Sequence, residues 1–197
     1  MKFIDKKTIK LDKVMNELDR FTLRFIKILE KHTDYVIVSG YVAILLGRTR
    51  ATEDIDIFIE EQDKEKINKL YKELKKHGYW CLNSSNVNEI FSYLSEGLAV
   101  RFALKDQTTP NFELKFAKKM LSKESFNDAL IVMTKHGKIK ISSLERQIAF
   151  KKYYLKSDKD MEDAKYIEDL FKVHLNQSRI NDYKKLIQNE MAKTRKR

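Results

Sequence analysis

Residues 38–59, VSGYVAILLGRTRATEDIDIFI, decide how this chain folds. The run of β-branched and aromatic residues over 35–38 predicts a short buried strand that runs directly into Ser39-Gly40. A short helix over 41–46 is expected next, and Asp54-Ile55-Asp56-Ile57-Phe58-Ile59 predicts a second strand that begins with two carboxylates. The pattern is therefore strand, turn, short helix and acidic strand.

The two carboxylates of the second strand are the most informative side chains. Residues i and i+2 of a strand point to the same face, so Asp54 and Asp56 lie only about 6–7 Å apart along it. A divalent cation would relieve their repulsion, and Mg²⁺ is commonly held by one or two carboxylates together with substrate phosphates. The alternative is a strand whose polar edge faces solvent.

The turn before this strand has the chemistry of a phosphate site. Ser39-Gly40 ends a strand and opens a helix, where backbone N–H groups can hold a phosphate. Arg48, Arg50 and Thr52 follow and can bind further phosphate oxygens. The alternatives are an ordinary tight turn and a solvated loop. A positive φ at Ser39 would be poorly tolerated, because the left-handed region favours glycine.

The remaining patterns predict alternating elements and then helices alone. A capping box from Ser142 to Glu145 is expected to open the helical region, and a basic tail over 193–197 ends it. We expect helices over 11–29, 62–77, 88–94, 143–155, 158–173 and 178–194, strands over 80–82, 98–104 and 112–116, and a hairpin of 130–133 with 138–141.

Composition narrows the class of protein. The 197 residues include 40 Lys and Arg against 29 Asp and Glu, a net charge of +11 that favours an anionic partner such as nucleic acid or nucleotide. No apolar run approaches the roughly 18 residues of a membrane span, and no secretory signal is recognisable. A lone Cys81 allows neither an internal disulfide nor a cysteine-based zinc site. We expect a cytoplasmic protein with no membrane partner.

Residues 38–59 as a whole resemble the first motif of the nucleotidyltransferase superfamily (DNA polymerase β-like), and most closely its AbiEii/AbiGii toxin-like (MenT-like) branch. The resemblance continues weakly to about Phe171. It implies an α+β fold in which a mixed sheet is flanked by helices. Residues 1–141 would form this nucleotidyltransferase domain, and the helical region 142–197 would pack on it.

The resemblance also implies further site residues. A third carboxylate is expected on a later strand, and the matching residue is Glu113, which shares a strand face with Lys115. The branch carries a lysine on one downstream helix and an aspartate on the next. Lys151 and Asp160 are the preferred matches; Lys152 competes, since helix phase cannot be fixed within one residue.

These features together predict a metal-dependent nucleotidyltransferase. Asp54, Asp56 and Glu113 would bind Mg²⁺ or Mn²⁺, Ser39, Gly40, Arg48, Arg50, Thr52, Lys115 and Asp160 would surround the nucleoside triphosphate, and Lys151 would offset developing charge. The expected acceptor is an RNA such as tRNA, or a protein, and a toxin or antitoxin is a further expected partner. The alternatives are a catalytically silent RNA-binding or antitoxin-like module of the same fold and a structural α/β domain.

Overall fold

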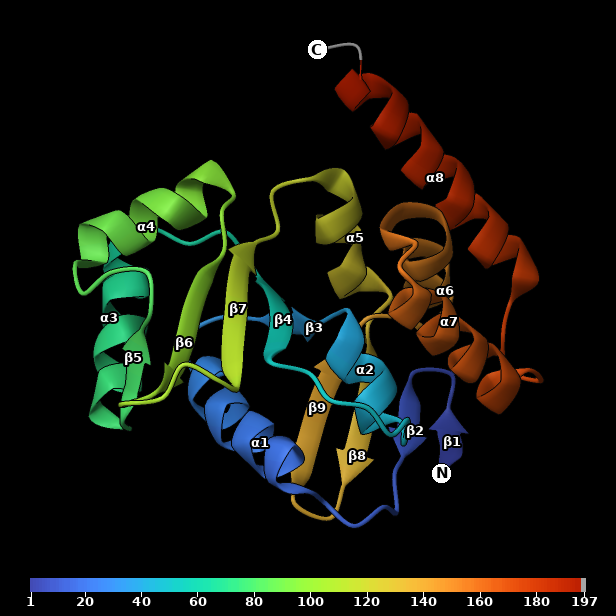
Figure 1. The fold of residues 1–197 in the computed structure, drawn as a ribbon, viewed down its shortest axis with the longest axis horizontal. Coiled ribbons are helices and arrows are strands. Elements are labelled where there is room, and N and C mark those ends of the chain that lie inside the picture. Colours follow the sequence, from blue (N-terminus) through green and yellow to red (C-terminus); the bar gives the residue numbers. More distant parts are fainter. Residues whose placement is uncertain (196–197) are drawn as a thin grey trace.

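The computed structural model describes residues 1–195, and Lys196 and Arg197 of the basic tail lie outside the described residues. Over that range the fold is α+β, as the sequence predicts: one mixed nine-stranded sheet in the order β1-β2-β8-β9-β3-β4-β7-β6-β5, flanked by helices (Figure 1). The strands are β1 Lys2–Asp5, β2 Thr8–Lys10, β3 Tyr35–Ile37, β4 Asp54–Ile59, β5 Tyr79–Cys81, β6 Val100–Leu104, β7 Asn111–Phe116, β8 Leu130–Thr134 and β9 Gly137–Ile141. The helices are α1 Glu17–Leu29, α2 Gly40–Leu45, α3 Lys64–Lys76, α4 Val87–Glu96, α5 Met120–Asn127, α6 Leu144–Phe150, the π-helix η1 Lys151–Leu155, α7 Asp158–Phe171 and α8 Gln177–Arg195.

Strand β4 lies in the interior of the sheet. It pairs antiparallel with β3 on one side and parallel with β7 on the other. The parallel register sets Asp54 opposite Asn111 and Asp56 opposite Glu113. The fold therefore places the third predicted carboxylate beside the second aspartate.

Helix α1 covers the face of the sheet that lies opposite to the side chains of Asp56 and Glu113, and its aromatic rings stack there. The rings of Phe21 and Phe25 lie 4.4 Å and 3.8 Å from the ring of Phe112 on β7. The helix begins at Glu17, later than the predicted residue 11, because Asn16 caps it: its side chain accepts from the backbone N–H of Asp19. In the segment before the helix, Leu11 and Met15 are buried whereas Val14 is exposed.

The sequence patterns did not predict three elements, the strands β1 and β2 and the helix α5. The edge strand β1 and its neighbour β2 have only four and three residues, too few to show the apolar alternation that identifies a strand. Helix α5 has a weak apolar face, and no side chain caps its N-terminus. The predicted capping box is wrong by one residue, because Ser143 caps α6 and accepts from the N–H of Arg146.

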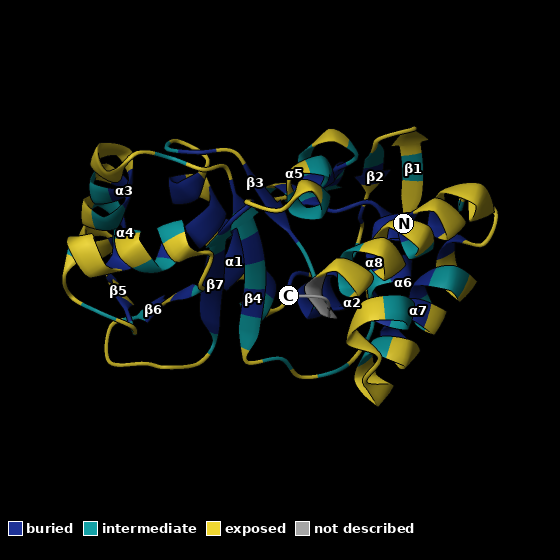
Figure 2. Cartoon of the chain, turned by 90° about the horizontal axis from the view of Figure 1, so that it is seen from above, coloured by how far each residue is buried: buried dark blue, intermediate teal, exposed yellow. Residues whose placement is uncertain are grey.

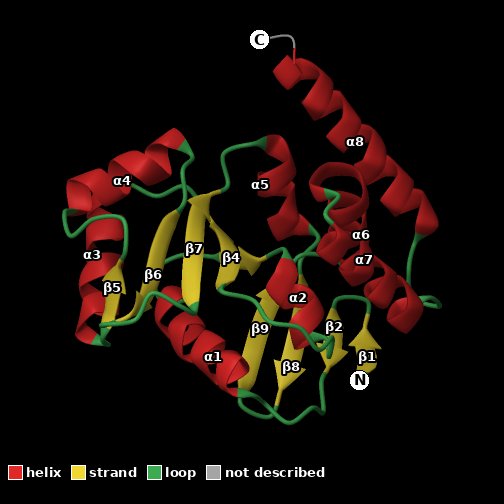
Figure 3. Cartoon of the chain, viewed as in Figure 1, coloured by secondary structure: helices red, strands yellow, loops and turns green. Residues whose placement is uncertain are grey.

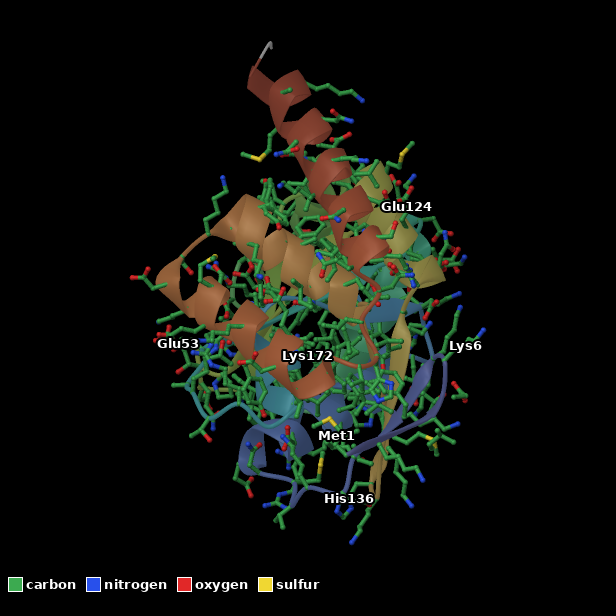
Figure 4. All side chains as sticks on the ribbon, turned by 90° about the vertical axis from the view of Figure 1, so that its right-hand side faces the viewer. Met1, Lys6, Glu53, Glu124, His136 and Lys172 are labelled. Carbon is green, nitrogen blue, oxygen red and sulfur yellow. The ribbon has the colours of Figure 1, made fainter. Side chains whose placement is uncertain are left out.

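The helices that follow residue 141 pack beside the sheet and on α2 (Figure 3). The Tyr166 hydroxyl of α7 donates to the carbonyl of Leu46 at 3.1 Å, and Ile167 is fully buried. Figure 4 looks onto this side and shows α7 and α8 in front of the strands. The predicted division between residues 141 and 142 falls between β9 and α6.

Burial follows the layers of the fold. The sheet strands are mostly buried, whereas the outer faces of α3, α4, α7 and α8 are exposed (Figure 2). Within residues 1–195, the helices are all too short or too polar to span a bilayer.

Candidate functional site

Asp54 and Asp56 extend from one face of β4, and Phe58 follows them on that face. All three are half-buried, whereas Ile55 and Ile57 on the other face are buried in the core. The alternation of the sequence thus fixes the strand's orientation, since a slip of one residue would bury both carboxylates. The same-face pair that the sequence predicts is present.

The carboxyl of Asp56 is held in an environment that disfavours its charge. Burial and the neighbouring Asp54 carboxylate raise the pKa of Asp56 to about 6, and Glu113 adds to the effect. Lys115 and a side-chain hydrogen bond from Ser39 act in the opposite direction. Asp56 is therefore a carboxylate that a nearby cation would stabilise strongly.

Glu113 is nearly buried beside Asp56, but its oxygens already have cationic partners. The Nε atom of Arg101 lies 2.6 Å from Oε1, and Nζ of Lys115 lies 3.4 Å from Oε2. Burial raises the pKa of Glu113, but the hydrogen bond from Arg101 and the charge of Lys115 outweigh it, so that the pKa lies below its usual value. Arg101 is a site neighbour that sequence reasoning missed, although its strand register places it opposite Glu113.

The donor set fits a divalent cation shared by Asp54 and Asp56. Among residues 1–195, no three acidic, histidine or cysteine side chains come together in a group that could hold a metal ion. Two carboxylates with the phosphates of a substrate are nevertheless a usual ligand set for Mg²⁺. Glu113 lies beside Asp56 in the strand register, but both of its oxygens already contact the cationic side chains of Arg101 and Lys115.

The Ser39-Gly40 turn has the backbone geometry that the sequence argued against. Ser39 has φ 63° and ψ −140°, a region that L-residues rarely occupy. Gly40 opens the six-residue helix α2, and a Cβ on Gly40 would clash with Nη2 of Arg50. Ser39 thus has the positive φ that a serine tolerates poorly, and Arg50 separately lies so close to Gly40 that a Cβ there would displace its guanidinium.

Arg48 and Arg50 converge on Asp163 of α7. Arg48 forms ion pairs with Asp163 and Glu162, and the Nη2 atom of Arg50 lies 3.0 Å from Oδ2 of Asp163. Burial raises the pKa of Asp163, but Arg50, Lys151 and Arg48 together bring it below its usual value. Neither arginine is among the residues that line the cavity described below.

Thr52 is directed at the aspartate strand itself. Its hydroxyl lies 3.3 Å from a carboxylate oxygen of Asp54 and 3.1 Å from the backbone carbonyl of the same residue. The structure therefore places Thr52 as a neighbour of Asp54.

Lys151, in η1, is fully buried and turned toward α7. Its Nζ atom lies 3.1 Å from Oδ1 of Asp160 and 2.8 Å from Oδ2 of Asp163. Lys152 points elsewhere and pairs with Glu168 at 2.6 Å. Asp160 is thus a partner of Lys151, as the pairing of the two helices predicts, but the more buried partner is Asp163, which sequence reasoning missed.

A cavity of about 910 Å³ joins the sheet to the helical region. Of the predicted residues, Ser39, Asp56, Lys115 and Lys151 line it, whereas Asp54 and Glu113 do not. Lining residues that were not predicted include Lys118, Lys119, Arg146, Gln147, Phe150 and Tyr154. The helical spacing of four residues before and three after Lys151 could have identified Gln147 and Tyr154.

The fold is that of nucleotidyltransferases. Three solved structures show this. The solution structure of the antibiotic-resistance factor ANT(2'')-Ia has TM-score 0.55 at 15% identity, over 90% of this chain and 96% of that one. The crystal structure of ANT(2'')-Ia with adenylyl-2''-tobramycin has TM-score 0.56 at 12% identity, over 87% and 97%. An antigenic nucleotidyltransferase-like protein from Paracoccidioides brasiliensis has TM-score 0.51 at 19% identity, over 88% and 86%. No protein-family model and no curated protein sequence matches the chain.

Proposed function

We propose that the protein is a metal-dependent nucleotidyltransferase that moves a nucleoside monophosphate from a nucleoside triphosphate to an acceptor hydroxyl. The observation that carries the proposal is the meeting of Ser39, Asp56 and Lys151 at one cavity of a nucleotidyltransferase fold. These residues come from a turn, a strand and a distant helix. Their meeting brings an acidic, metal-binding type of side chain next to cationic groups suited to phosphate.

In this proposal the acidic residues bind the metal ion and the basic residues bind the phosphates. Asp54 and Asp56 hold Mg²⁺ or Mn²⁺, which when bound neutralises phosphate charge and orients the triphosphate for in-line attack. Lys115, on the strand next to Asp56, and Lys151, on the helical side of the cavity, offset negative charge at the phosphates. The acceptor hydroxyl loses its proton to solvent as its oxygen forms a bond to the α-phosphorus. The bond from the α-phosphorus to the oxygen that bridges to the β-phosphate breaks, and pyrophosphate leaves.

The other predicted residues act around this centre. Gly40 and Ser39 form the phosphate-side turn, and Thr52 orients Asp54 through its hydroxyl. Arg48 and Arg50 keep positive charge beside the turn while Asp163 and Asp160 hold Lys151 in place. Glu113 would be the third metal ligand that the resemblance implies, and Arg101 and Lys115 would orient its carboxylate.

We assign the acceptor to RNA such as a tRNA end, with a protein as the rival, and we assign the chain to the toxin-like branch on the motif of residues 38–59. The net charge of +11 supports an anionic acceptor. Binding to RNA should weaken steeply as salt rises, with log K falling linearly against log salt concentration. A protein acceptor would show a shallower dependence, and a toxin or antitoxin partner would be identified by co-purification.

The second candidate is a catalytically silent module of the same fold, favoured by the ion pairs that already occupy Glu113. Thermal shift with each nucleoside triphosphate separates the two candidates. The enzyme is stabilised by nucleotide only when Mg²⁺ or Mn²⁺ is present, whereas the silent module shows no metal-dependent stabilisation.

The direct experiment measures label transfer from each of the four labelled nucleoside triphosphates to total RNA and to protein. Asp54→Ala and Asp56→Ala should each abolish transfer. Asp12→Ala, an exposed aspartate far from the site in sequence, is the matched control and should leave transfer unchanged. Transfer that survives both site substitutions would overturn the metal mechanism.

A further inference from the structure

Lysines form a row across four strands at the β1 end of the sheet. The pairing of β1 with β2 sets Lys2 opposite Lys10. Lys10 in turn lies opposite Met133 of β8, and Met133 lies opposite Lys138 of β9. Cross-strand partners share one face of a sheet. Neighbouring strands are about 4.8 Å apart, so Lys2 and Lys10 are separated by about 5 Å and Lys10 and Lys138 by about 10 Å.

This lysine row is open to solvent and strongly cationic. Lys2, Lys10 and Lys138 are exposed, whereas Ile9 and Ile139 on the other face are fully buried. In the part of the chain that the structure describes, none of the three lysines forms an ion pair. Residues 2–10 and 130–141 together contain seven lysines and one acidic residue.

Protection of the sheet edge does not account for the whole row. Lysines on an outermost strand prevent another chain from pairing with it, and β1 is such a strand. Lys138, however, lies on β9, which is paired with β8 on one side and with β3 on the other. Its ammonium group therefore adds charge to the face of the sheet, away from the edge.

The lysine row lies on the same face of the sheet as Asp56. Ile37 of β3 pairs with Ile57 of β4 and with Ile141 of β9, so the three isoleucines share one face. Asp56 precedes Ile57 by one residue and Lys138 precedes Ile141 by three, so the alternation of each strand directs both to the opposite face.

Helix α5 connects the lysine row to the cavity. Ser122 of α5 lines the cavity, and the carbonyl of Asn127 at the end of this helix accepts from Nζ of Lys7 at 3.1 Å. Lys7 belongs to the turn between β1 and β2. In Figure 4, Lys6 of that turn and Glu124 of α5 lie on the same side of the molecule. A chain bound along the lysine row can therefore reach the cavity over one short helix.

We propose that the lysine row binds the phosphate backbone of an RNA. A helical nucleic acid strand carries one phosphate about every 3.4 Å, so a strand lying across the row can bring a phosphate to each lysine. Met133, partly exposed between Lys10 and Lys138, offers an apolar contact to a base. The inference rests on the proposed function for the identity of the partner, since it gives the RNA acceptor a place on the protein.

The test measures binding of fluorescently labelled polyuridine RNA by anisotropy over a range of salt concentrations, without nucleotide or divalent metal. The variant carries Lys2→Gln, Lys10→Gln and Lys138→Gln together. Each lost phosphate contact reduces the slope of log K against log salt by about 0.7, so the slope should become shallower by about 2 and affinity at low salt should fall about 10-fold or more. The melting temperature should not change, because the three side chains are exposed.

The matched control carries Lys66→Gln, Lys72→Gln and Lys76→Gln on α3, which packs against β5 at the other end of the sheet. These lysines are exposed as well, so the control loses the same charge and should bind RNA as the wild type does. Equal losses in the two variants would overturn the proposal, because binding would then follow net charge alone.

Lysine acetylation of the wild-type protein, followed by mass spectrometry, needs no substitution. Bound RNA should protect Lys10 and Lys138 and leave Lys72 reactive. Equal reactivity of all three with and without RNA would contradict the assigned surface.

Failure of this surface and failure of the proposed enzyme can be told apart. Label transfer by a wild type whose RNA binding is unchanged in the row variant would overturn the surface alone. RNA binding that depends on the row, with no transfer from any nucleoside triphosphate, would overturn the enzyme and keep the surface. Binding of polyglutamate through the same lysines, as tight as that of RNA, would assign the row to an acidic protein instead.

Discussion

Lys151 of η1 and Asp163 of α7 form an ion pair of 2.8 Å in which neither side chain is more than 1% exposed. Asp163 also accepts from Arg48 and Arg50, so one buried carboxylate joins the helical region to the loop before β4. Removing one member of a buried ion pair leaves uncompensated charge. The relationship makes Asp163 a determinant of stability as well as a neighbour of the site.

Asp163→Asn should lower the free energy of unfolding by about 3–5 kcal/mol, since three cationic groups lose their shared carboxylate. Urea denaturation followed by circular dichroism measures the change. Asp160→Asn is the control: its carboxyl also contacts Lys151 but is partly exposed, and the expected loss is about 1 kcal/mol or less. Equal losses for the two variants would contradict the central position of Asp163.

The two adjacent lysines should differ sharply. Lys151→Ala leaves Asp163 and Asp160 without their shared ammonium group in a buried position, and should destabilise the protein by about 3–5 kcal/mol. Lys152→Ala removes a partly exposed pair with Glu168 and should cost about 0–1 kcal/mol. Chemical denaturation of both variants decides which lysine belongs to the site, and the reverse order would assign it to Lys152.

Asp56→Asn should change stability in a pH-dependent way when no divalent cation is present. Its folded pKa of about 6 lies above the roughly 3.9 of an unfolded aspartate, so the folded state favours the protonated form. That stabilisation is complete below the unfolded pKa and is lost as pH rises through the folded pKa.

The asparagine variant escapes this loss, and at pH 7.5 it should be about 2–3 kcal/mol more stable than wild type. The difference should shrink toward zero at pH 4. Urea titrations of both proteins in EDTA across this range measure it. A difference that stays constant with pH would show that Asp56 titrates normally.

Gly40→Ala should be destabilising because its Cβ would displace the guanidinium of Arg50 from Asp163. We expect a loss of about 1–3 kcal/mol, as for other overpacked sites. A double-mutant cycle with Arg50→Ala provides the check, since the glycine substitution should cost far less once the guanidinium is absent. Additive losses would mean that another contact restricts position 40.

The central part of the fold was predictable because its patterns are local. The alternation of Asp54 to Ile59 determines which face of the strand is buried, and the β-branched run before Ser39 marks the strand beside it. The strands at the β1 edge were not predictable, since a three-residue segment such as Thr8–Lys10 carries too little pattern and becomes a strand by pairing with β1 and β8. Tertiary contact overrides propensity there.

In the site, too, features set by local sequence patterns were predictable and features set by tertiary contacts were not. The face shared by Asp54 and Asp56 follows from strand geometry, and the choice of Glu113 follows from the resemblance, so their register could be anticipated. The partners of these residues could not be predicted from the sequence. Arg101 pairs with Glu113. Asp163 pairs with Arg50 and Lys151, and no spacing in the sequence indicates these contacts. The positive φ of Ser39 and the close approach of Arg50 to Gly40 also depend on tertiary contacts that no sequence spacing indicates.

Strand β4 is hydrogen-bonded on both sides, whereas the helical wall of the cavity includes the short π-helix η1. Fully paired interior strands are among the last parts of a protein to open. The two aspartates therefore lie on one of the most stable parts of the fold. Adaptation to a different acceptor can therefore proceed by replacing side chains of α5, α6 and α8, while the chemistry on β4 is inherited unchanged.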